Sequence, residues 1–164
     1  MSRLTSSPMT EVSRFRVVLD TNVILAALLS RNPASPTVEL LHRWRNGEFA
    51  LLYCTDLLLE YQEKLITKQI HLERRLGFLS SLIAKGFSVN LVPAEIVPRV
   101  LADPDDDVVL ACALIGDATH LVTYDPHLLT LEETYRQQVN ILDGLHFLYA
   151  LRGDSPPVTG CAPG

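Results

Sequence analysis

The sequence lacks two features that would each decide the class of protein at once. No apolar run approaches the roughly 20 residues that a membrane-spanning helix requires, which argues against a transmembrane protein. There is also no excess of positive charge, because 14 Lys and Arg stand against 19 Asp and Glu, for a net charge of −5. Such a chain does not attract nucleic acid by bulk electrostatics, so any contact with phosphate must be local or pass through a metal ion.

Cysteine is scarce as well. Cys54, Cys112 and Cys161 are widely spaced and form neither a CxxC pair nor a disulfide framework. Such a set is typical of a reducing compartment, and the first residues lack the continuous apolar stretch of a secretory signal. We therefore expect a cytoplasmic protein that does not associate with a membrane, in which Cys54 and Cys112 are small core residues.

The length and the apolar content indicate one globular domain. A chain of 164 residues with 48% hydrophobic residues can bury a substantial core without disulfides or metal. Residues 1–14 are polar, whereas residues 153–164 contain three Gly and three Pro. We expect a flexible N-terminal extension over residues 1–14, a single domain over residues 15–152 and a disordered tail over residues 153–164.

Between the two ends, short β-branched apolar runs alternate with longer segments of helical periodicity. The pattern predicts strands at residues 16–19, 49–54, 88–92, 120–123 and 139–142, and helices at residues 22–30, 35–46, 55–65, 72–85 and 105–115. This alternation is typical of an α/β protein. It predicts a three-layer sandwich around a mostly parallel central sheet.

Acidic residues stand near the ends of the predicted strands. Asp20 directly follows the first strand, and Asp125 comes two residues after the fourth. The aspartate run 105–107 opens a helix, and Glu60 lies on the helix after the second strand. Open parallel sheets bind ligands outside the carboxyl ends of their strands, and Mg²⁺ and Mn²⁺ prefer carboxylate oxygens. These acids together predict a metal site that can also hold phosphate.

Each acidic position also has an ordinary structural explanation. Asp20 can cap a helix, and the aspartate run can complement the positive end of a helix dipole. Asp125 can open a turn before a proline. Glu60 can form a surface pair with Lys64, four residues later. The order of the acids along an alternating α/β chain favours the metal site over these separate explanations.

Four segments carry these acids in a distinctive order. They are VVLDTNVILAALL (residues 17–29), LLLEYQEKL (57–65), DPDDDVVLACAL (103–114) and HLVTYDPHLL (120–129). Together they resemble the PIN-domain family, and in particular the VapC-like toxins of bacterial toxin-antitoxin pairs. The combination of a strand, D-T-N and an apolar helix with a late V-T-x-D is the most specific part of this resemblance, which covers nearly all of the expected domain.

The resemblance implies a ribonuclease that uses Mg²⁺ or Mn²⁺ to hydrolyse RNA phosphodiester bonds. It assigns Asp20, Glu60, Asp125 and one member of the aspartate run as catalytic metal ligands. It further implies an antitoxin partner, which would cover the acidic cleft or fill it with a basic side chain, and a homodimer.

Two observations select Asp106 from the aspartate run. Leu110 and Ala113 lie four and seven residues later, so they place Asp106 on the inward stripe of the helix. The spacing of the PIN family before A-C-A selects the same residue. Asp107 is the alternative.

Two polar neighbours complete the set that the resemblance implies. Asn22 matches the polar residue beside the first acid of the family and would orient that acid or a metal-bound water. Thr123 matches the hydroxyl residue that precedes the last acid, and would orient the ligands from behind.

Two other functions stay open on sequence alone. A PIN-like scaffold would bind RNA or protein without cutting, although the complete acidic set argues against it. A haloacid-dehalogenase-like phosphatase also places an Asp after its first strand. That enzyme normally has a second Asp two residues later, where this chain has Asn22, and no suitable later Lys is evident.

The histidines and the basic residues are less informative. The five histidines show no zinc-binding spacing, so we expect none to hold a metal; His127, near Asp125, could touch substrate but is expected to be a turn residue. Half of the basic residues lie on the helices of the middle third. They are either phosphate contacts or a solvated helix face: Arg43, Arg45, Lys64, Lys68, Arg74, Arg75 and Lys85.

Overall fold

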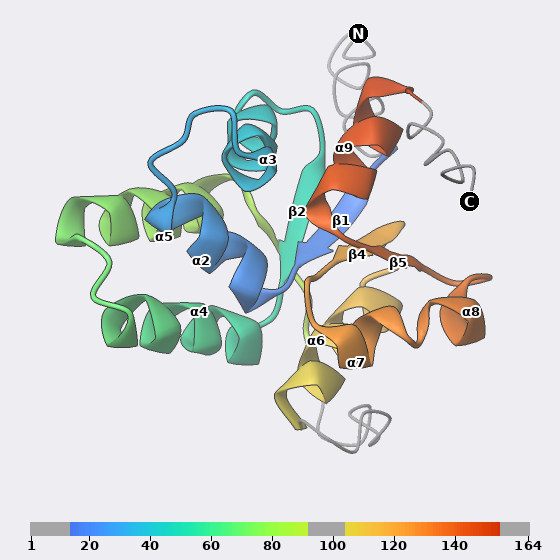
Figure 1. The fold of residues 1–164 in the computed structure, drawn as a ribbon. Coiled ribbons are helices and arrows are strands. Elements are labelled where there is room, and N and C mark those ends of the chain that lie inside the picture. Colours follow the sequence, from blue (N-terminus) through green and yellow to red (C-terminus); the bar gives the residue numbers. More distant parts are fainter. Residues whose placement is uncertain (1–13, 92–103, 155–164) are drawn as a thin grey trace, which may run out of the picture.

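The computed structural model describes residues 14–91 and 104–154, and it confirms the predicted α/β class. Five strands form one sheet in the order β3-β2-β1-β4-β5 (Figure 1). The strands are β1 (Arg16–Leu19), β2 (Ala50–Tyr53), β3 (Phe87–Ser88), β4 (His120–Val122) and β5 (Asn140–Leu142). All neighbouring pairs are parallel, where the sequence predicted a mostly parallel sheet.

Helices connect the strands and cover both faces of the sheet, as a three-layer sandwich requires. They are α2 (Thr21–Leu29), α3 (Pro36–Arg45), α4 (Thr55–Thr67), α5 (Leu72–Lys85), α6 (Pro104–Ile115), α7 (Pro126–Leu129), α8 (Glu132–Tyr135) and α9 (Gly144–Arg152). Figure 1 shows α9 in front of the sheet and α6 behind it. The five predicted helices are α2 to α6, each within two residues of its predicted bounds.

The central strands are continuous apolar runs because both of their faces are buried. Val17, Val18 and Leu19 in β1 are fully buried, and so are Leu51 and Leu52 in β2. When helices cover both sides of a parallel sheet, neither face of a strand meets water and the alternation of polar and apolar residues is lost. β1 lies at the centre of the sheet, so the residue that follows it stands at the centre of the carboxyl edge.

Local capping explains where several helices begin and end. Asp20, Asp125 and Asp143 precede α2, α7 and α9, and the side chain of each accepts a hydrogen bond from a backbone N–H of the first turn. Pro36 stands in the first turn of α3, where no intrahelical N–H is needed. Gly153 ends α9 with a φ of 76°, a left-handed conformation that glycine adopts without a steric cost.

Helices α7, α8 and α9 were not predicted from the sequence. The first two helices have four residues each, which is too short for a periodic pattern to show. Helix α9 does carry a signal. Asp143 precedes it, Phe147 and Leu151 lie one turn apart on its buried side, and Gly153 follows it.

Other expectations meet the structure only in part. The expected flexible extension and disordered tail lie almost wholly outside the described residues, as do Cys161 and the end of the strand predicted at residues 88–92. Cys54 and Cys112 are buried free thiols, as predicted. Of the helices in the described ranges, none is long and apolar enough to cross a membrane.

His120, at the start of β4, makes the stability dependent on pH. Its ring centroid lies 5.6 Å from that of Phe15 and 5.1 Å from that of Phe147, and burial lowers its pKa to about 4. The unfolded chain accepts a proton near the ordinary pKa of about 6.5, whereas the folded protein resists protonation down to about pH 4. We expect the free energy of unfolding to fall by on the order of 2 to 3 kcal/mol as the pH drops through this window, and to level off below it.

Urea unfolding at pH 7 and pH 4.5 tests this expectation. In His120→Phe the difference in unfolding free energy between the two pH values should shrink, because phenylalanine fits between the same aromatic rings and does not titrate. His42→Gln, at an exposed position, serves as the control and should keep the wild-type difference. An unchanged difference in His120→Phe would show that other groups cause the acid sensitivity.

Candidate metal centre

The site is built on the carboxyl ends of β1 and β4, which lie side by side. Leu19 of β1 pairs with Val122 of β4, and the Asp20 backbone N–H donates to the Val122 carbonyl at 2.9 Å. The next residue of each strand therefore stands at the same edge. In this way Asp20 and Thr123, 103 residues apart in sequence, come into contact.

Asp20 is held in one orientation by two hydrogen bonds. Its Oδ1 accepts from the backbone N–H of Thr21 at 2.8 Å, and its Oδ2 accepts from the hydroxyl of Thr123 at 2.7 Å. The residue is only 5% exposed. Burying a carboxylate is costly unless hydrogen bonds or a cation compensate for the lost water. The two donors thus orient the Asp20 carboxyl group at the sheet edge.

Thr123 connects the first acid to the last. Its hydroxyl donates to Asp20, while its Oγ1 accepts from the backbone N–H of Asp125 at 2.9 Å. Thr123 is fully buried, so water does not compete for these bonds. The contacts are those of an orienting residue, and the role that the resemblance implies for Thr123 stays a prediction.

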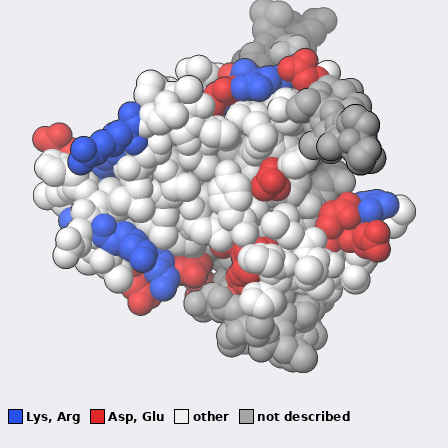
Figure 2. Space-filling view, viewed as in Figure 1, with Lys and Arg blue, Asp and Glu red and all other residues white. Residues whose placement is uncertain are grey.

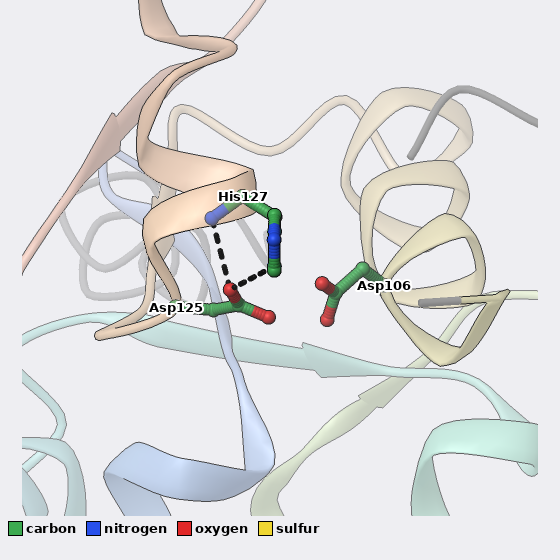
Figure 3. A group of neighbouring side chains, drawn as sticks. All are labelled: Asp106, Asp125 and His127. Atoms are coloured by element: carbon green, nitrogen blue, oxygen red, sulfur yellow. Dashed lines mark hydrogen bonds and ion pairs between the residues drawn. The ribbon is translucent and has the colours of Figure 1, made fainter. Parts of the chain in front are cut away.

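Asp106, Asp125 and His127 form a compact group of potential metal ligands. Each offers one ligand atom, and these atoms all lie within 4.8 Å of one another. Figure 3 shows the two carboxyl groups facing each other, with the His127 ring beside Asp125. Oδ1 of Asp125 accepts from the His127 backbone N–H at 2.9 Å and lies 3.1 Å from the ring Nδ1.

The Asp106 carboxyl changes the pKa of the Asp125 carboxyl that faces it. A hydrogen bond with the Asp106 carboxyl is the main cause that holds the pKa of Asp125 below its ordinary value, and His127 lowers it further. Two carboxyl groups this close either share one proton or are both ionised beside a cation. A hard divalent cation prefers such oxygen donors, so the residues fit Mg²⁺ or Mn²⁺.

Glu60 reaches the site from α4. Its Oε2 accepts from the Thr21 hydroxyl at 2.8 Å, and the backbone N–H of the same threonine donates to Asp20. Thr21 therefore couples Glu60 to the first acid across two helices. Figure 2 shows acidic side chains gathered on the side of the molecule where α4 and α7 lie.

Burial alone does not distinguish Asp106 from Asp107, which are 4% and 6% exposed. The predicted inward stripe does not distinguish them either, because all five residues from 109 to 113 are buried and this part of α6 has no solvent face. The group with Asp125 and His127 contains Asp106. The geometry thus favours Asp106 as the third ligand, a role that stays a prediction with Asp107 as the alternative.

The contact of Asn22 is with the backbone of the opposite segment. Its Oδ1 accepts from the N–H of Tyr124 at 3.3 Å. Because Tyr124 lies between Thr123 and Asp125, Asn22 helps to position the segment that carries them. The sequence-based role, orientation of the first acid or of a metal-bound water, stays a prediction.

His127 was not predicted as part of the site, because the five histidines show no zinc-binding spacing. A different signal is present. The side chain of an Asp before a helix turns toward the N–H groups of the first turn, so the sequence D-P-H brings the histidine to Asp125. His127 was also named as a possible substrate contact, and its place beside Asp125 is compatible with that.

Residues 16–127 match the sequence model of the PIN domain family. The chain belongs to this family. The matched range includes every acid of the site, so membership supports a nuclease and sets aside the phosphatase alternative. No curated protein is similar to the chain at a significant level.

Two solved structures are similar to this PIN domain. A chain in the structure of FitAcB from Neisseria gonorrhoeae is 15% identical with a TM-score of 0.47, over 79% of this chain and 99% of that one. A chain in the structure of VapBC2 from Rickettsia felis bound to a promoter DNA fragment is 12% identical with a TM-score of 0.49, over 77% of this chain and 97% of that one. Because both the identities and the TM-scores are low, the function is inferred from the residues of this chain and from its family.

Proposed function

We propose that this PIN domain is a metal-dependent endoribonuclease that hydrolyses RNA phosphodiester bonds with Mg²⁺ or Mn²⁺. The observation that carries the proposal is the continuous link from Asp20 through Thr123 to Asp125, which faces Asp106. Helix capping explains Asp20 and Asp125 one at a time, but it does not explain why these two and Asp106 lie at one edge of the sheet.

The proposal gives each side chain a task. Asp20, Asp106 and Asp125 would hold the ion, and Glu60 would complete the acidic set from α4. A bound divalent cation polarises a phosphoryl oxygen and lowers the pKa of its bound water. The protein itself supplies orientation: His127 holds one oxygen of Asp125, and Figure 3 shows the other oxygen turned toward Asp106.

We also propose that the enzyme acts in the cytoplasm as the toxin of a toxin-antitoxin pair, as the family resemblance implies. A basic side chain of the antitoxin would complement the clustered carboxylates and so block metal and RNA. A homodimer belongs to the same proposal. Apolar side chains on α4 and α5 that are more than half exposed offer a surface for a second copy: Leu59, Ile66, Leu72, Leu76 and Ile83.

The purified protein should cut RNA with Mn²⁺ and stop when a chelator is added. Millimolar Mn²⁺ should also raise its melting temperature, because an ion that binds only the folded state adds RT ln(1 + [L]/Kd) to its stability and relieves repulsion among the acids. Incubation with a panel of RNAs and thermal melts with and without metal measure the two effects.

The opposite result has a definite meaning. A protein that shows neither a metal-dependent rise in melting temperature nor cleavage of any RNA would be a scaffold that binds RNA or a partner without cutting. Ca²⁺ serves as a control, since it binds carboxylates but supports little chemistry of this kind and so separates stabilisation from catalysis.

A further inference from the structure

Arginine side chains line a groove at the other end of α2 from the acids. One hollow, of about 270 Å³, is lined by Arg31, Arg45, Arg74 and His42 above apolar residues of α2 and α3. A second hollow, of about 290 Å³, shares Arg31 and Arg74 and continues to His71. We call the two together the arginine groove.

Three separate segments bring these cations together. Arg31 follows α2, Arg45 ends α3 and Arg74 lies in the first turn of α5. Within the part of the chain that the structure describes, none of the three has a carboxylate oxygen within 4.0 Å, whereas Arg43 and Arg136 are ion-paired. In a chain with a net charge of −5, this concentration of uncompensated positive charge indicates an anionic ligand.

The chemistry of the groove fits phosphate groups along a strand. A guanidinium offers five N–H donors in a planar fork that matches phosphate oxygens. Arg74 uses one of its own to donate to the Leu28 carbonyl, which fixes its side chain in the groove. An apolar floor beneath a cationic rim suits the sugars and bases of a nucleic acid better than a free inorganic ion.

The contacts in the structure divide the basic residues of the middle third into two groups, which the sequence alone did not distinguish. Arg43 is held by Glu39 and Glu48, and Lys85 donates to a backbone carbonyl of α3. Arg45 and Arg74, by contrast, line the groove. Figure 2 shows Lys and Arg side chains on the side of the molecule where α4 and α5 lie.

We propose that the arginine groove binds phosphates of the RNA substrate a few nucleotides from the cut. This inference rests on the proposed ribonuclease function. Helix α2 has nine residues, so at 1.5 Å per residue its two ends are about 13 Å apart. A stacked strand rises about 3.4 Å per nucleotide, which places the groove roughly four nucleotides from the acids. The groove would therefore set affinity for long RNA, while the acids carry out the cleavage.

The test measures binding of a labelled 20-nucleotide single-stranded RNA by fluorescence anisotropy in EDTA, so that no cleavage is needed. The double variant Arg31→Ala, Arg45→Ala removes two exposed side chains from the groove without touching the core. We expect Kd to rise about tenfold at low salt, and the slope of log K against log salt to fall by about 0.7 for each lost phosphate contact. Arg136→Ala removes a positive charge outside the groove, from the exposed residue that follows α8, and should bind like wild type.

A second arm uses Mn²⁺ and compares the 20-nucleotide RNA with a dinucleotide that is too short to reach the groove. The double variant should show a raised KM with an unchanged kcat on the long RNA, and unchanged kinetics on the dinucleotide. If Arg136→Ala weakens RNA binding as much as the double variant does, the effect is one of bulk charge and the proposal is wrong.

The remaining outcomes separate this proposal from the proposed function. Metal-dependent cleavage with the same KM in the wild type and the double variant would show that the groove does not bind the RNA substrate. The proposed ribonuclease activity would remain supported. RNA binding that depends on the two arginines, together with no RNA cleavage in the presence of any metal ion, would support RNA binding by the groove and overturn the proposed ribonuclease activity. Unchanged RNA binding together with lost capture of an acidic protein partner would assign the groove to that partner instead.

Discussion

Replacing Asp20, Asp106 or Asp125 with Asn is expected to lower the rate of RNA cleavage about 100-fold or more. Asn keeps the shape of the side chain but removes the negative charge that a divalent cation needs, and losing such a contact typically costs this much in rate. The fold should survive, because Asn is as good a helix cap as Asp at the starts of α2 and α7. Single-turnover cleavage and the Mn²⁺-induced melting shift should fall together in these variants.

Asp107→Asn is the matched control for Asp106→Asn. It lies on the same helix and is nearly as buried, yet it should keep most of the activity. The cost in stability is expected to include the helix-terminal contribution of roughly 0.3 to 1 kcal/mol. Asp105→Asn should also keep most of the activity. If Asp107→Asn is inactive while Asp106→Asn cuts normally, the third ligand must be reassigned by one residue.

Phe147→Ala should lower the free energy of unfolding by about 3 to 5 kcal/mol, the cost of removing a buried aromatic ring and leaving a cavity. Phe147 is fully buried, and its ring centroid lies 5.4 Å from Phe49, 6.1 Å from Phe15 and 5.1 Å from His120. It therefore joins α9 to the sheet. Since domains of this kind are stable by only about 5 to 15 kcal/mol, the loss is a large share of the total.

Urea unfolding at pH 7 measures this loss, and Leu145→Ala provides the comparison on the same helix. Leu145 is 41% exposed, so its truncation should cost well under half as much. If the two substitutions lowered the free energy of unfolding equally, α9 would stabilise the protein through its helix propensity and not through packing of its side chains in the core.

The sheet and the five longer helices that connect its first strands could be predicted because their signals are local. The buried strands are short apolar runs, and α5 agrees with its predicted bounds at both ends, where Gly86 follows it. Helix α9 was missed although its cap and periodicity were readable. Its nine residues lie inside the predicted domain of residues 15–152, and their signal is as local as those of the predicted helices.

The sequence was enough to predict which acidic residues come together at the candidate site. Asp20 and Asp125 follow parallel strands, and the carboxyl ends of such strands meet at one edge by the geometry of the sheet. How the acids interact was not predictable. Thr123 bonds to Asp20 across 103 residues, and Thr21 bonds to Glu60 across 39.

The sequence by itself determined the class of the fold, its family and the set of acids, because strand and helix periodicity, caps and motifs act over a few neighbouring residues. Tertiary structure alone decided that His127 joins Asp106 and Asp125. It also favours Asp106 over Asp107 where helical phase cannot, since residues 109–113 of α6 are all buried. It also decided that Arg31, Arg45 and Arg74 share one groove. Contacts of this kind depend on how three helices pack against one another, and no local pattern of residues specifies that packing.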